Sequence, residues 1–111
     1  MKPMNPLAQM HCQPLEGTMP MPADIIASQL ARVPGWALIE GAIEKRYEFA
    51  DFHRTIAFVN AVAWIANAED HHPDLAVSYG HCTVRFNTHS VKGISINDFI
   101  CAAKLDALLS P

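Results

Sequence analysis

The sequence has no cluster of basic residues, no long apolar run and few cysteines, and each shortage excludes a class of protein. Its 111 residues include eight Lys and Arg against eleven Asp and Glu, which gives a net charge of −3 with neutral histidines. No four basic residues occur in a row, so a nucleic-acid surface is not favoured. The longest apolar stretch, Ile56 to Ala66, contains Asn60 and is too short to span a bilayer, so we expect no membrane segment.

The cysteines and the first residues indicate the compartment. Cys12, Cys82 and Cys101 are odd in number and widely spaced, which argues against a disulfide framework and favours a reducing environment. Near the start, Lys2 is the one basic residue and no apolar secretory segment follows it. We therefore expect a cytoplasmic protein. Neither C-x-x-C nor H-x-x-x-H spacing occurs, so no zinc motif is present.

Composition divides the chain into two parts. Residues 1–21 hold four prolines and all five methionines without a periodic apolar pattern. We predict that this segment is a flexible N-terminal arm and that residues 22–111 form a single domain. His11 and Cys12 in the arm are metal-binding residue types, but two ligands do not make a metal site.

Hydrophobic periodicity predicts the order of elements in the domain. Apolar residues recur at helical spacing over residues 22–33, 51–66 and 95–107, and they alternate over 36–40, 43–49, 75–79 and 82–89. Glycines and prolines separate these segments. The order predicts an α+β fold, α-β-β-α-β-β-α, in which three helices pack on one face of a four-stranded antiparallel sheet.

Polar residues gather around the second predicted hairpin. The pair His71-His72 precedes it, Tyr79 ends its first strand, His89 ends its second strand, and Asp98 opens the last helix. A fold that joins these segments brings the residues to one cleft. Imidazoles beside carboxylates suit proton transfer near neutral pH, because an unperturbed histidine titrates there.

Three of the polar residues have a second interpretation. Asp98 follows Ser95 by three positions, which is the spacing of a capping box, and helix capping alone would account for it. Asp70 either ends its helix or orients His71 through a carboxylate–imidazole hydrogen bond. Tyr79 is either a core residue or a site residue.

The segment EDHHPDLAVSYGHCTVRFNTHSVKGISINDFICAAKLDAL resembles the pterin-4a-carbinolamine dehydratase family, in its bacterial type. The shared pattern covers roughly residues 33–109. The resemblance implies the fold described above and a hydro-lyase activity, that of 4a-hydroxytetrahydrobiopterin dehydratase. Such an enzyme eliminates water from 4a-hydroxytetrahydropterin, which aromatic amino-acid hydroxylases release, and gives quinonoid dihydropterin for tetrahydropterin recycling. The pterin is the substrate, so we expect neither a cofactor nor a metal.

The resemblance also implies roles for the polar residues. We expect His71 and His89 to transfer protons and His72 to orient the pterin. The full expected set comprises the catalytic His71, His72 and His89 and the substrate-binding Asp70, Tyr79 and Asp98. Animal members tend to have arginine directly before the motif aspartate, where this chain has Asn97, so one cation that would hold Asp98 ionised is missing.

Two other functions stay open. Animal relatives also serve as a dimerisation cofactor for a homeodomain transcription factor, so the chain is alternatively a non-catalytic binding module for a regulatory protein. The second alternative is a metal site, for which His71, His72 and His89 would have to converge on one ion.

The last helix has a second apolar stripe, Cys101, Leu105 and Leu108, beside its core stripe. We interpret this stripe as the interface of a homo-oligomer, either a dimer or a tetramer.

Overall fold

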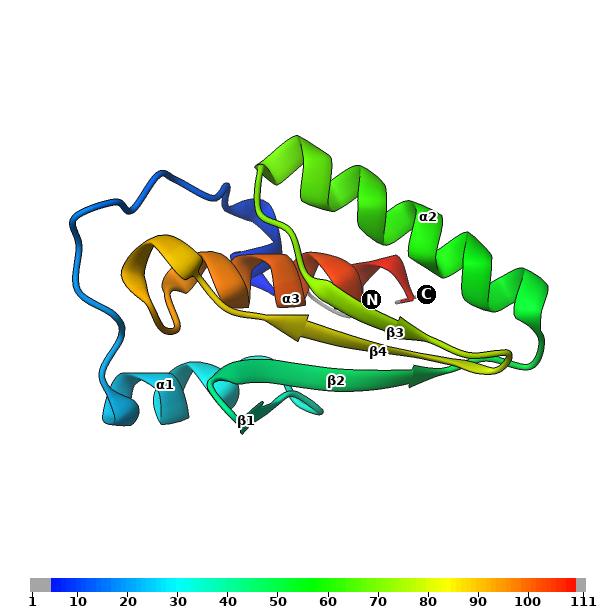
Figure 1. Ribbon diagram of the computed structural model, residues 1–111. Helices are drawn as coiled ribbons and strands as arrows, with labels where there is room; N and C mark the ends of the chain where they lie inside the picture. Colours follow the sequence, from blue (N-terminus) through cyan, green and yellow to red (C-terminus); the bar gives the residue numbers. More distant parts are fainter. Residues whose placement is uncertain (1–4, 110–111) are drawn as a thin grey trace.

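The computed structural model describes residues 5–109 and has the predicted order of helices and strands (Figure 1). One antiparallel sheet has the strand order β1-β2-β4-β3. Its strands are β1 (Ala37–Ile39), β2 (Ala42–Glu48), β3 (Asp74–Val77) and β4 (His81–Phe86). The helices are α1 (Ala23–Leu30), α2 (Phe52–Glu69) and α3 (Ile96–Leu108), with two short 3-10 helices, η1 (Pro6–Gln9) and η2 (His89–Val91). The predicted α+β class is confirmed.

The core lies between the sheet and helices α2 and α3. Both helices lie on the same side of the sheet, and α1 lies next to the start of β2 (Figure 1). Along β4, the side chains of Cys82, Val84 and Phe86 are buried, while those of Thr83 and Arg85 are half-buried, as a period of two requires. Among the residues that the structure describes, no helix has the length and apolar character needed to cross a membrane.

Local capping signals explain where the helices next to the site begin and end. The Asp51 side chain accepts a hydrogen bond from the Arg54 N–H and starts α2. That helix ends at Asp70, whose left-handed backbone has φ 53°. Ser95 and Asp98 form the capping box of α3, so the predicted box is confirmed.

The N-terminal segment packs on α3. Leu7 of η1 is fully buried in the core, and Lys104 of α3 donates to the Ala8 carbonyl at 2.9 Å. The flexibility predicted for residues 1–21 stays a prediction; residues 1–4 lie outside the described range, and residues 5–13 contact the domain. The composition of this segment gave no sign of the contact, because a single buried leucine makes no periodic pattern.

This packing corrects the interpretation of the second apolar stripe of α3. Cys101 and Leu105 are fully buried within one chain, and Leu108 is 41% exposed. The stripe as an oligomer interface is therefore wrong. The physical reason is that η1 and the residues after it lie on α3, where Cys12 contacts Cys101, so the chain covers this face of the helix itself.

Candidate functional site

A buried carboxylate holds the first histidine of the His71-His72 pair. His71 Nε2 lies 2.6 Å from Asp98 Oδ1, and the two side chains are 12% and 0% exposed. The main-chain N–H of His71 donates to the Ala66 carbonyl at the end of α2. Its ring stacks on Phe86 of β4 with centroids 5.7 Å apart and planes 8° from parallel. The imidazole is therefore fixed in position by three elements, α2, β4 and α3.

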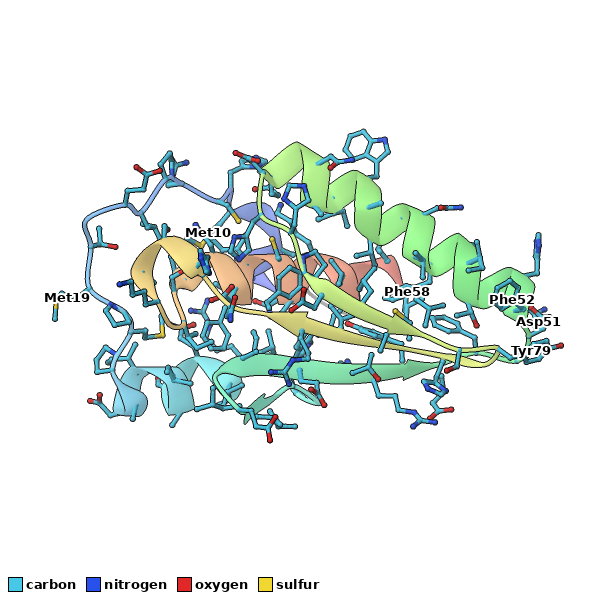
Figure 2. The ribbon with its side chains drawn as sticks, viewed as in Figure 1. Met10, Met19, Asp51, Phe52, Phe58 and Tyr79 are labelled. Carbon is cyan, nitrogen blue, oxygen red and sulfur yellow. The ribbon has the colours of Figure 1, made fainter. Side chains whose placement is uncertain are left out.

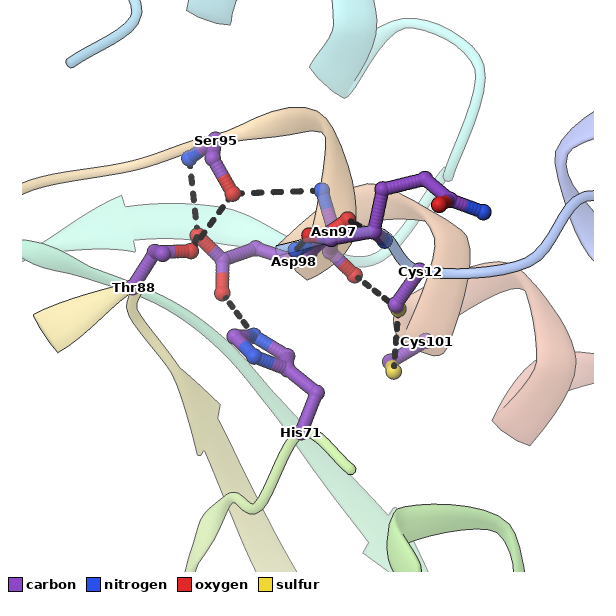
Figure 3. A network of polar contacts seen from close by, with 8 residues as sticks. Cys12, His71, Thr88, Ser95, Asn97, Asp98 and Cys101 are labelled. Atoms are coloured by element: carbon purple, nitrogen blue, oxygen red, sulfur yellow. Dashed lines mark hydrogen bonds and ion pairs between the residues drawn. The ribbon is translucent and has the colours of Figure 1, made fainter. Parts of the chain in front are cut away.

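The second oxygen of Asp98 completes a buried network (Figure 3). Asp98 Oδ2 accepts hydrogen bonds from Thr88 Oγ1 at 2.8 Å and from the Ser95 N–H at 2.9 Å. The hydroxyls of Thr88 and Ser95 are also hydrogen-bonded to each other. A buried carboxylate is costly unless it is hydrogen-bonded, and here both oxygens have partners. Asp98 thus caps α3 with one oxygen and binds His71 with the other.

The other two expected histidines lie at the surface. His72 is exposed, and its Nε2 is 3.1 Å from Asn67 Oδ1. His89 is exposed at the start of η2, directly after the buried Thr88. The prediction that His89 lies in a strand is wrong. The strand ends at Phe86 because the chain turns back on itself, with the Thr88 N–H donating to the Gly93 carbonyl at 2.8 Å.

Asp70 ends its helix and is not the carboxylate that orients His71. The Asp70 N–H donates to the Ala66 carbonyl, and Asp70 is exposed to solvent. The carboxylate that His71 binds is that of Asp98. Of the two interpretations of Asp70, the structure shows helix termination.

The structure does not bring Tyr79 to the histidines. Tyr79 lies in the turn between β3 and β4, is 68% exposed and stacks on Phe52 with centroids 6.2 Å apart (Figure 2). Phe52 is the first residue of α2, whereas His71 follows its last turn. The 18 residues of α2 span about 27 Å at roughly 1.5 Å each. Placing Tyr79 in the site is therefore wrong, because β3 leads the chain away from His71.

Glu69, next to Asp70, is a carboxylate that the sequence analysis missed. Its side chain is 7% exposed, with Oε2 2.9 Å from His11 Nδ1 and Oε1 accepting from the Cys12 N–H at 2.7 Å. Burial acts to raise the pKa of Glu69. The hydrogen bonds from Cys12 and His11 and the positive charge of Lys104 outweigh burial, so this pKa is lowered from its ordinary value. No local motif indicates these contacts, because they join positions 57 and 58 residues apart.

The carboxylates and histidines do not form a metal centre. Within residues 5–109, no group of three or more His, Cys, Asp and Glu side chains is arranged to hold a metal ion. Of the three predicted catalytic histidines, one has an oriented and nearly buried imidazole and the other two have exposed imidazoles. This arrangement suits the exchange of protons with a bound molecule.

A sequence comparison identifies the family of the chain. The sequence model of the family described as pterin 4 alpha carbinolamine dehydratase matches residues 19–108. The chain belongs to the pterin-4a-carbinolamine dehydratase family. This is a family of hydro-lyases, and the resemblance noted from the sequence is confirmed.

Individual relatives agree over nearly the whole chain. A protein from Chromobacterium violaceum, named "Putative pterin-4-alpha-carbinolamine dehydratase", is 46% identical over 92% of this chain and 94% of its own. A protein with the same name from Xanthomonas campestris pv. campestris (strain 8004) is 53% identical over 93% of this chain and 90% of its own. A crystal structure titled transcriptional coactivator/pterin dehydratase from Brucella melitensis has a TM-score of 0.79 at 27% identity, and covers 82% of this chain and 99% of that one.

The matched family region and the packed arm are different parts of the chain. All six predicted site residues lie within residues 19–108, which the family of pterin-4a-carbinolamine dehydratases shares. The contacts of Leu7, His11 and Cys12 with the domain come from residues before this range. The family model does not cover these arm contacts, whereas the alignments with the two relatives extend into the arm.

Proposed function

We propose that this chain dehydrates 4a-hydroxytetrahydropterin to quinonoid dihydropterin by histidine acid–base catalysis. The observation that carries the proposal is the hydrogen bond between His71 and the buried Asp98, inside the region that matches the dehydratase family. The 4a-hydroxytetrahydropterin would be released by an aromatic amino-acid hydroxylase in the cytoplasm. Its dehydration would return the pterin to the tetrahydropterin cycle.

His71 is suited to be the base. The elimination requires removal of a proton from a ring nitrogen of the pterin and delivery of a proton to the departing 4a-hydroxyl, which leaves as water. The carboxylate of Asp98 accepts the Nε2–H of His71, which leaves Nδ1 to accept a proton. The same carboxylate then stabilises the imidazolium that forms, as in other carboxylate–histidine pairs.

His89 and His72 have the remaining roles. Both are exposed, so a substrate reaches them without displacing core residues. We assign proton delivery to His89 and orientation of the pterin to His72. Asp98 is fully buried and acts through His71, so its predicted substrate contact becomes a positioning role. Asp70, exposed beside His71, remains our candidate contact with the substrate.

The first prediction concerns His71 and His89. His71→Ala and His89→Ala should each slow dehydration by roughly 10²–10⁴-fold, the usual contribution of a positioned proton-transfer group. His71→Ala should also lower the melting temperature, because it leaves the buried Asp98 carboxylate without one partner. The measurement is the decay of 4a-hydroxytetrahydropterin at slightly alkaline pH, at a temperature well below every unfolding transition.

His53→Ala is the matched control, since His53 is exposed on the first turn of α2. Its rate should equal that of the parent protein. Retention of at least half of the parent rate by both His71→Ala and His89→Ala would show that these residues are not the proton-transfer groups.

The second prediction is that catalysis needs neither a metal nor a cofactor. Imidazoles that exchange protons near neutral pH supply the acid and the base that the elimination requires. Protein dialysed against EDTA should therefore dehydrate 4a-hydroxytetrahydropterin at the untreated rate, and added zinc should not increase it. Activity that disappears with EDTA and returns with zinc would contradict the mechanism.

A further inference from the structure

Two of the three cysteines meet in the fold although 89 positions separate them. Cys12 Sγ lies 3.6 Å from Cys101 Sγ, and the Cys12 thiol donates to the main-chain carbonyl of Asn97 at 3.6 Å (Figure 3). A thiol has one hydrogen, and Cys12 donates its hydrogen to the Asn97 carbonyl. In the contact between the two thiols, Cys101 is therefore the donor and Cys12 the acceptor. This hydrogen bond and burial raise the pKa of the Cys101 thiol.

The arm holds Cys12 against α3 through several contacts. The Asn97 side chain exchanges two hydrogen bonds with the main chain of Gln13, at 3.1 and 2.8 Å. The Cys12 N–H donates to Glu69, and Leu7 anchors the segment in the core. The two sulfurs are thus placed together by contacts on both sides of Cys12, and their proximity does not depend on the thiols alone.

The two thiols differ in access. Cys12 is partly exposed, whereas Cys101 is fully buried on the helix beneath it. A reagent from solvent therefore reaches Cys12 first, and Cys101 is the thiol in place to react next. This is the arrangement of an attacking cysteine and a resolving cysteine.

We propose that Cys12 and Cys101 form a redox modification site at which a peroxide produces a disulfide that joins the N-terminal arm to α3. Cys12 sulfur attacks one peroxide oxygen, the O–O bond breaks, and a sulfenic acid and one water form. Cys101 sulfur then attacks the Cys12 sulfur, and the hydroxyl leaves with the Cys101 proton as a second water. Two thiols are oxidised and hydrogen peroxide is reduced to two waters. The sulfurs must approach by roughly 1.6 Å to reach a disulfide bond length.

The disulfide would fix the arm across the two elements that support the site. The arm binds Glu69 at the end of α2 and Asn97 in the first turn of α3. His71 follows the end of α2 by two residues, and Asp98 lies on α3. The bond would also close a loop that spans almost the entire domain. A long closed loop restricts the unfolded chain, so the oxidised protein should be more stable than the reduced one.

The test uses the full chain, reduced and freed of reductant, then exposed to hydrogen peroxide and quenched with a thiol-alkylating reagent. Intact mass and peptide mapping should show loss of two of the three thiols, a decrease of two hydrogens and a Cys12–Cys101 cross-link. The melting temperature should rise by at least about 5 °C and return to its original value with dithiothreitol. None of these readouts depends on dehydratase activity, so this proposal and the proposed function fail independently.

The third cysteine supplies the matched control. Cys82 is fully buried in β4, and burial raises the pKa of its thiol. Cys82→Ala should still form the cross-link and show the rise in melting temperature, whereas Cys12→Ser and Cys101→Ser should lose both. Three alkylated thiols after peroxide, a sulfinic acid on Cys12, a bond between two chains, or an unchanged melting temperature would each overturn the proposal.

Discussion

Asp98 is the residue on which helix α3 and the candidate site both depend. Its spacing from Ser95 predicted a capping box from four consecutive residues, and the structure has that box. Its contact with His71 joins positions 27 residues apart, so no local pattern contains it. The sequence therefore predicted the capping role of Asp98, but for the orientation of His71 it offered the nearer carboxylate, Asp70, as one of two interpretations.

Thr88 tests whether the hydrogen bonds of Asp98 support both the fold and the position of His71. It is buried, and its hydroxyl binds both Asp98 Oδ2 and the Ser95 hydroxyl. Thr88→Val keeps the shape of the side chain but leaves these buried oxygens with fewer partners, which should cost about 1–3 kcal/mol of unfolding free energy. We also expect the looser His71 to raise the activation free energy by about 1.4 kcal/mol, so kcat should fall about tenfold.

Denaturant unfolding and the dehydration assay measure the two effects. Thr83→Val on the open face of β4, where the side chain is half-buried, is the control and should change both values little. A Thr88→Val protein with the parent's stability and kcat would show that the Asp98 network does not position His71.

Helices and strands were predictable where their apolar residues repeat within one segment. The alternation of Cys82, Val84 and Phe86 predicted β4, and the helical spacing of apolar residues over 51–66 predicted α2. One face of α2 is buried, with Thr55, Phe58, Val62 and Ala66. The extension of β4 to His89 was wrong because the alternation continues through the buried Thr88, although the backbone has already turned. Alternation reports burial, and it does not distinguish a strand from a turn that buries one residue.

The arm was the element that the sequence could not place. Its contacts with α3 come from Leu7, Lys104, Asn97 and the cysteine pair, all of which join distant positions. The sequence does not indicate these contacts, so it offered no segment of the same chain to cover the second apolar stripe of α3. The stripe was therefore predicted to contact a second subunit.

Leu7 tests the place of the arm in the core. Leu7 is fully buried, so Leu7→Ala should lower the unfolding free energy by about 2–5 kcal/mol, the usual effect of emptying a leucine site. Met10→Ala is the matched control, because Met10 lies at the end of the same 3-10 helix and is 44% exposed (Figure 2). Its effect should stay within about 0.5 kcal/mol. Equal stabilities of the two variants would show that the arm is not part of the core.

At the scale of the whole molecule, apolar surface stays exposed along α2 and at the end of α3. Trp64 on α2 is 73% exposed. Between α2 and the end of α3 lies an apolar hollow of about 370 Å³. Its lining consists of Phe49, Arg54, Ala57, Phe58, Ala61, Leu108 and Leu109. Ala61 and Trp64 are three residues apart and so share one side of α2. A largely exposed tryptophan beside an apolar hollow is typical of interaction sites.

We therefore predict that the chain forms a homo-oligomer through the outer surface of α2, in place of the α3 stripe. Light scattering at micromolar concentration should give at least twice the chain mass of 12.2 kDa. Trp64→Glu should reduce the oligomer mass, because a charge would enter an apolar interface, while Ser28→Glu on the exposed side of α1 should not. Leu105→Glu should unfold the protein, since Leu105 is fully buried in one chain. A 12.2 kDa particle for the parent protein would rule out the oligomer, and a Trp64→Glu protein of unchanged mass would rule out this interface.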